Sequence, residues 1–255
     1  MTLLELKEFL DEKADFYEQK EFIQNDPIII PHEYEDKFDI EISGFIISII
    51  SWGNRKSIIN SGYKIMDILE SSPYDFIMNH SQKDLKRIKG SIHRTFNSDD
   101  LVFFIKSLKN IYTNYNGLEG IISNVKNGNN LQERISNFKK IFFELNHLER
   151  TKKHLPDPLK GSAAKRFNMF LRWMVRSNKK GVDFGLWKSI LPSELSCPLD
   201  VHTGNIARKL GLLKRTQNDS LALNELDKKL REMDKNDPVK YDFALFGLGV
   251  FEKFA

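Results

Sequence analysis

A lysine directly follows a short turn in the second half of the chain. The turn runs from Leu159 to Ala164 and contains Gly161, and Lys165 then begins a segment with helical periodicity. Such a turn can direct backbone N–H groups and the positive end of a helix toward a phosphate. The lysine amine would then be placed to act as a nucleophile. A solvated basic helix face explains the same residues, and this interpretation stays open for the stretch taken alone.

Further cations follow the lysine at helical steps. Arg172 and Arg176 share a face with Lys165, and Met169 lies one turn after the lysine on that face. We therefore expect the small positive excess of the chain to gather at this turn and helix. The predicted phosphate-contacting residues are Lys160, Gly161, Ser162, Ala163, Arg172 and Arg176.

An aspartate precedes a second helix with apolar periodicity. Asp200 stands just before Val201, and Ile206 and Leu210 continue the apolar face. Its ordinary role is to cap that helix, because its side chain can accept hydrogen bonds from the first backbone N–H groups. A catalytic role is compatible with the cap. His202 is expected to support the site, and no second ligand stands at metal spacing, so we predict no metal site.

Together these stretches resemble the helix-hairpin-helix DNA glycosylase superfamily, which includes endonuclease III and the 8-oxoguanine DNA glycosylases. The family hairpin has the form Leu-Pro-Gly-Val-Gly-x-Lys, and Leu159 to Lys165 matches its leucine, first glycine and lysine. The second family signature, Val-Asp-x-His, corresponds to Leu199 to His202. The chain also looks like a bacterial branch related to the archaeal-type 8-oxoguanine enzymes, through Phe170 to Arg176 and Asp237 to Phe243.

The resemblance implies an all-α, two-lobed helix-hairpin-helix glycosylase fold with a cleft between the lobes. Lobe one would span about 38–178, with the central helices and the hairpin, and lobe two about 1–37 plus 179–255. The implied partner is double-stranded DNA that contains a damaged base, and no cofactor is implied. The sequence makes no prediction of the oligomeric state.

The resemblance also implies a mechanism in which the damaged base is flipped out of the helix. Lys165 would attack C1′ as a free amine, displace the base and form a Schiff base that permits strand cleavage, while Asp200 stabilises the developing positive charge. Asp242, Phe246 and Met169 would line the base pocket. Trp52 and Asn54 would lie near a DNA-intercalating loop. The sequence thus predicts a base-excision repair glycosylase with AP lyase activity on an oxidised purine such as 8-oxoguanine.

The chain departs from the family pattern at several positions. Ala163 replaces the second hairpin glycine, and Lys160 replaces the proline. Lys165 and Asp200 are 35 positions apart (200 − 165), and the inserted segment 181–195 is expected to form an extra helix. Two alternatives therefore stay open. One is a catalytically silent helix-hairpin-helix protein that binds DNA or acts as a repair scaffold, and the other is a glycosylase for alkylated or deaminated bases.

The rest of the chain is predicted to be helical. Apolar residues recur at three- and four-residue steps, the run 45–50 predicts a buried central helix, and no stretch alternates convincingly like a strand. The predicted helical segments are 3–23, 45–50, 57–69, 98–115, 131–148, 162–176, 182–191, 201–212, 220–233 and 239–253.

The composition of the 255 residues excludes several protein classes. There are 39 Lys+Arg against 35 Asp+Glu, a net charge of +4, and 29 aromatic residues (19 Phe, 3 Trp, 7 Tyr), too many for a disordered chain. The single Cys197 cannot form a disulfide framework or a four-cysteine iron–sulfur cluster. We therefore expect a cytoplasmic protein, associated with the nucleoid when bound to DNA. The longest apolar run is far shorter than the roughly 20 residues that span a bilayer, so no membrane partner is expected.

Overall fold

The computed structural model describes residues 2–252, and these fold mostly as helices. The chain forms two compact units. Unit 1 combines the chain up to Phe22, Asn130–Glu133 and the chain from Pro156 onward, and unit 2 holds Ile23–Asn129 and Arg134–Leu155. The lobes expected from the sequence placed 156–178 with the central helices, whereas the structure groups this segment with the terminal ones.

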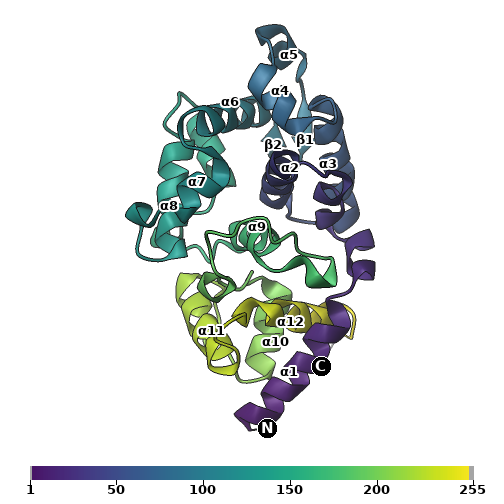
Figure 1. Cartoon of the computed structure of the whole chain (residues 1–255), viewed down its shortest axis with the longest axis vertical. Helices are drawn as coiled ribbons and strands as arrows, with labels where there is room; N and C mark the ends of the chain where they lie inside the picture. Colours follow the sequence, from purple (N-terminus) through teal and green to yellow (C-terminus); the bar gives the residue numbers. More distant parts are fainter. Residues whose placement is uncertain (1, 253–255) are drawn as a thin grey trace. The chain divides into compact units, whose positions relative to one another are not determined.

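Unit 2 is built around the long apolar helix α2 (Figure 1). Every residue of α2 from Ile40 to Ile50 is buried, which confirms the predicted central helix. The rings of Phe45, Phe104 and Phe142 pack with centroids 4.8–6.1 Å apart and extend this core. The elements of unit 2 are η2 (Pro27–Ile29), η3 (Pro31–Glu33), α2 (Lys37–Ile50), α3 (Arg55–Ile68), α4 (Pro73–Asn79), α5 (Gln82–Arg87), β1 (Ser91–His93), β2 (Phe96–Asn97), α6 (Ser98–Asn114), α7 (Gly117–Ser123), η4 (Val125–Asn127) and η5 (Glu149–His154), where η denotes a 3₁₀-helix.

Unit 1 packs its C-terminal helix against the first helix and against α10 (Figure 1). Its core is aliphatic, with Leu10, Leu226, Leu245 and Leu248 fully buried. The elements of unit 1 are α1 (Leu3–Tyr17), η6 (Pro158–Lys160), α9 (Lys165–Val175), η7 (Asn178–Lys180), η8 (Pro192–Glu194), α10 (Val201–Lys209), α11 (Ser220–Met233), η9 (Pro238–Lys240) and α12 (Tyr241–Val250). Two elements have residues in both units, η1 (Lys20–Asn25) and α8 (Leu131–Phe142).

The structure corrects the helix predicted at 182–191. Apart from the one turn of η8, the segment 181–195 is irregular in the structure. Its backbone instead caps α9, because the N–H groups of Phe184 and Trp187 donate to the carbonyls of Trp173 and Met174 at 2.8 and 2.9 Å. The last carbonyls of a helix have no partner within the helix, so the segment satisfies groups that would otherwise be unpaired.

Smaller differences concern element ends and a hairpin of strands. The structure contains an antiparallel pair, β1 and β2, in a region where no strand was predicted. The predicted C-terminal helix starts at Tyr241 rather than Val239, and residue 253 lies outside the described residues. No helix in residues 2–252 is long and apolar enough to cross a membrane.

Candidate functional site

The hairpin before α9 adopts a left-handed backbone at two positions. Gly161 has φ 91°, and a side chain added there would meet only open space, so a ligand can approach its backbone closely. Ala164, the residue before α9, has φ 48°, and its N–H donates to the Ser162 hydroxyl at 3.1 Å. Lys165 is therefore the first residue of the helix, three residues later than the predicted helix start, and its side chain is half-buried.

A buried asparagine holds this hairpin. Asn168 Nδ2 donates to the carbonyl of Ala163 at 3.0 Å, and Asn168 Oδ1 accepts from Gln132 Nε2 at 2.9 Å. A non-glycine residue with positive φ costs of order 1–3 kcal/mol and persists only where its surroundings fix it. Sequence reasoning missed Asn168, although its position one turn after Lys165 placed it within reach of the hairpin.

Asp200 caps α10, as the sequence predicted. Its carboxylate accepts from the Thr203 N–H at 2.9 Å, and its side chain stays half-buried. Asn218 Nδ2 donates to the Asp200 carbonyl at 2.8 Å and fixes the backbone before the helix. The carboxylate therefore has a defined place at the start of α10 while part of it remains accessible.

Asp242 on α12 is a buried carboxyl between a guanidinium and a thiol. Arg172 Nη1 donates to Asp242 Oδ2 at 2.6 Å, and the Cys197 Sγ lies 3.8 Å from Asp242 Oδ1. Burial raises the pKa of the Asp242 carboxyl to about 6, although Arg172 acts in the opposite direction. Burial also raises the pKa of the Cys197 thiol, and Asp242 adds to that effect.

The charges of residues that are distant in sequence affect the pKa of the Asp242 carboxyl. The charge of Asp200 raises the pKa of Asp242, and the charge of Lys165 lowers it. Met169 contacts the lysine directly, with 3.8 Å between Lys165 Nζ and the Met169 Sδ. Four of the predicted site residues, from α9, the start of α10 and α12, thus occupy one neighbourhood of unit 1.

The remaining predicted residues of α10 and α12 meet through an aromatic contact. Phe246 is half-buried, and its ring centroid lies 6.4 Å from that of His202 in an edge-to-face arrangement. The Phe22 ring packs edge-on against Phe246 at 6.1 Å. His202 itself is exposed at the first turn of α10.

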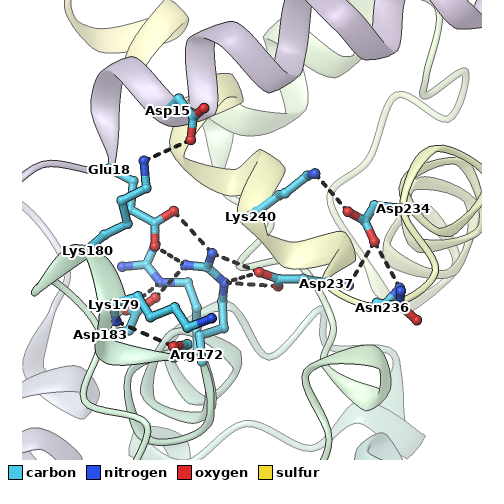
Figure 2. A network of polar contacts seen from close by, with 12 residues as sticks. Asp15, Glu18, Arg172, Lys179, Lys180, Asp183, Asp234, Asn236, Asp237 and Lys240 are labelled. Carbon is cyan, nitrogen blue, oxygen red and sulfur yellow. Dashed lines mark hydrogen bonds and ion pairs between the residues drawn. The ribbon is translucent and has the colours of Figure 1, made fainter.

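Arg172 and Arg176 require a correction, because the structure does not leave them free to contact phosphates. Both are only 4% exposed. Arg176 pairs with Glu18 at 2.7 Å, Asp183 at 2.6 Å and Asp237 at 2.9 Å. Figure 2 shows these carboxylates around the guanidinium groups of α9. The acids around Arg176 come from the end of α1, the irregular segment after α9 and the turn before α12. The two arginines of the predicted basic surface are therefore buried and already paired.

The other predicted DNA-contacting residues differ in exposure. Lys160 and Gly161 are exposed, Ser162 is half-exposed, and Ala163 is buried. Asn54 is exposed and caps α3 in unit 2, where its side chain accepts from the Ser57 N–H.

Trp52 is half-buried within unit 2. Its ring stacks on His154 with centroids 5.9 Å apart and meets His93 edge-on at 5.2 Å. These two rings hold Trp52 in place, so it is a packed residue and not a free wedge.

The described residues offer no group of three or more His, Cys, Asp or Glu side chains placed to hold a metal ion. The arrangement in unit 1 instead brings together an amine, two carboxyls and a thioether. An amine beside carboxyl groups of different burial can attack an electrophilic carbon while a neighbouring charge stabilises a cation.

Comparison with known proteins identifies one family. Residues 26–251 match the family DUF2400, which is described as a protein of unknown function. No curated protein and no solved structure matches the chain. Because the match extends over nearly the whole chain, including α3, the hairpin and the residues around Asp242, this protein belongs to the DUF2400 family.

Proposed function

We propose that the protein is a DNA base-excision glycosylase with AP lyase activity, acting in the cytoplasm on an oxidised purine such as 8-oxoguanine. The observation that carries the proposal is the convergence of Lys165, Asp200 and Met169 near Asp242. Lys165 and Asp200 belong to two separate sequence signatures and stand 35 positions apart (200 − 165). Their convergence in unit 1 supports a shared role.

In the proposed reaction Lys165 Nζ attacks C1′ of the damaged nucleotide, and the bond from C1′ to the base breaks. Asp200, half-buried at the start of α10, faces the positive charge that develops on the sugar. The amine then forms a Schiff base with the opened sugar, loss of a C2′ proton follows, and the 3′ phosphate leaves. The hairpin around the exposed Gly161 would hold a neighbouring phosphate through its backbone N–H groups.

The base would be recognised by Asp242, Phe246 and Met169. Arg172 holds one oxygen of Asp242, so the carboxyl has a fixed orientation in the proposed pocket. With a pKa of about 6, this carboxyl changes protonation near neutral pH and can switch between accepting and donating a hydrogen bond. Phe246 would stack on the flipped base.

The decisive test is borohydride trapping on duplex oligonucleotides that carry 8-oxoguanine, oxidised pyrimidines, uracil or an abasic site. The wild type should form a covalent complex with at least one lesion, because borohydride reduces a Schiff base. Lys165→Gln should abolish trapping and leave the affinity for the same duplex near that of the wild type. Trapping that persists undiminished in Lys165→Gln would refute the assignment of the nucleophile.

Asp200→Asn is the companion variant. It should lose base excision but remain folded, because asparagine can also cap a helix. Full activity in this variant would reduce Asp200 to a structural cap. If the wild type binds duplex DNA but no lesion yields a covalent complex or a free base, the catalytically silent DNA-binding protein becomes the better description.

A further inference from the structure

A hollow of about 460 Å³ runs along α3 in unit 2, and we call it the α3 groove. It is lined by Asn54, Lys56, Ser57, Asn60, Ser61 and Lys64. Each of these side chains can donate a hydrogen bond, and none of the six is acidic. Lysine ammonium groups and the polar side chains of Ser and Asn are typical contacts of phosphate oxygens.

The groove is held in shape by packing between α3 and β1, which lie side by side (Figure 1). Lys64 Nζ donates to the Ser91 carbonyl at 2.8 Å, and Ser61 Oγ lies 3.0 Å from His93 Nδ1. Lys56 is exposed and forms no ion pair with any residue in the described range 2–252. Lys64 is therefore a fixed cation at one end, and Lys56 is available at the other.

More positive charge surrounds the groove. The Arg94 guanidinium lies over Gly53, so closely that a side chain at Gly53 would collide with it. A neighbouring hollow shares Lys64 and is lined by Arg87 and Lys89 together with Glu70 and Asp84. Between Trp52 and Asn97 there are eight Lys and Arg against four Asp and Glu, an excess of four that equals the net charge of the whole chain.

The length of the groove favours an extended anion. Lys56 and Lys64 are eight residues apart on one helix, which corresponds to about 12 Å along its axis. One strand of a DNA duplex carries a charge about every 3.4 Å along the duplex axis, so this span faces several phosphates. A single phosphate could contact only one end.

We propose that the α3 groove is a second nucleic-acid-binding surface, which holds the phosphodiester backbone of duplex DNA from unit 2. The choice of DNA as the polyanion rests on the proposed function, whereas the groove and its charges do not. Binding here is independent of sequence and of any damaged base, because the contacts go to phosphates. Each phosphate contact releases a counterion, so the affinity contributed by the groove falls as salt rises.

The experiment measures binding of an undamaged 20-base-pair duplex to the full chain by fluorescence anisotropy over a series of salt concentrations. The slope of log K against log salt is negative, and loss of one phosphate contact should make it less steep by about 0.9 and weaken binding about fivefold at 0.15 M salt. We expect this result for Lys56→Gln. The double variant Lys56→Gln/Lys64→Gln should lose about 25-fold. The matched control Lys106→Gln removes an exposed helical lysine of unit 2 that does not line the groove, and it should bind like the wild type.

Equal effects of Lys56→Gln and Lys106→Gln would overturn the proposal, because binding would then reflect only net charge. Displacement of DNA by millimolar inorganic phosphate from the wild type but not from Lys56→Gln would also overturn it, in favour of a site for a small anion. Displacement by polyglutamate as readily as by unlabelled DNA would indicate an acidic protein partner instead. Because the duplex is undamaged, failure of the excision assay leaves this test intact, and failure of this test leaves the excision assay intact.

Discussion

Helices α9 and α3 both carry clustered cations in the sequence, but the structure uses those cations in opposite ways. Arg172 and Arg176 at the end of α9 are buried among carboxylates. Lys56 and Lys64 on α3 are exposed along a groove without acidic lining residues. The sequence predicts the basic surface on α9, whereas in the structure the cations of α3 are the more accessible ones.

The difference lies in residues that are far away in the sequence. The arginines of α9 meet Glu18, Asp183, Asp237 and Asp242, which come from both ends of the chain and from the irregular segment. These acids stand up to 158 positions from the arginines they bind. A cluster of basic residues on one helix therefore indicates a ligand-binding surface only when no acidic residues from other parts of the chain pair with it.

The largest expected effect tests the α9 side of this comparison. Arg176→Met should lower the free energy of unfolding by about 3–5 kcal/mol, because it leaves three carboxylates around a buried apolar side chain. Equilibrium urea denaturation measures the change. Arg176→Lys keeps the charge and should recover part of the loss. A change in the free energy of unfolding below about 1 kcal/mol for Arg176→Met would mean that water solvates the ion-pair network. The cations of α9 would then contribute as little to stability as those of α3.

A second prediction concerns pH and the carboxyl that Arg172 faces. The folded chain holds the proton of Asp242 more tightly than the unfolded chain, since the pKa rises from 3.8 to about 6. The resulting stability is complete below the unfolded pKa and is lost as the pH rises through about 6. The loss amounts to about 2 kcal/mol between pH 4 and pH 7.

The measurement compares urea unfolding of the wild type and of Asp242→Asn at several pH values, because asparagine does not titrate. The stability of the wild type relative to the variant should decrease across this pH range. A difference that stays constant with pH would show that Arg172 keeps Asp242 fully ionised throughout.

The smallest expected effect tests the α3 side. Lys56→Ala should change the free energy of unfolding by no more than about 0.5 kcal/mol, because Lys56 is exposed and unpaired within residues 2–252. Thermal unfolding followed by circular dichroism measures it. A loss comparable to that of Arg176→Met would show that the α3 cations are structural and would abolish the contrast between the two helices.

Much of the helical framework could be predicted because its signals are local. The apolar run 45–50, the capping aspartate at 200 and the exact range of α11 follow from residue order and periodicity. The segment 181–195 could not be predicted, because its conformation depends on the carbonyls of α9, to which Phe184 and Trp187 bind. A local pattern contains no information about such a partner.

The candidate site was predictable to a similar extent. Lys165 and Asp200 were found because each stands next to a recognisable helix start. Asn168 and the pairing of Arg172 with Asp242 were missed, since both depend on contacts across the fold. Residue type and spacing therefore identified the candidate reactive groups but not the residues that hold them.

The cysteine beside Asp242 has a practical consequence. Cys197 is fully buried, it is the single cysteine of the chain, and its thiol has a raised pKa because of burial and the neighbouring carboxyls. A thiol in this state does not react with alkylating reagents until the surrounding structure opens. The rate at which the native protein is alkylated therefore measures how often the structure around Cys197 in unit 1 opens. No engineered label is needed for this measurement.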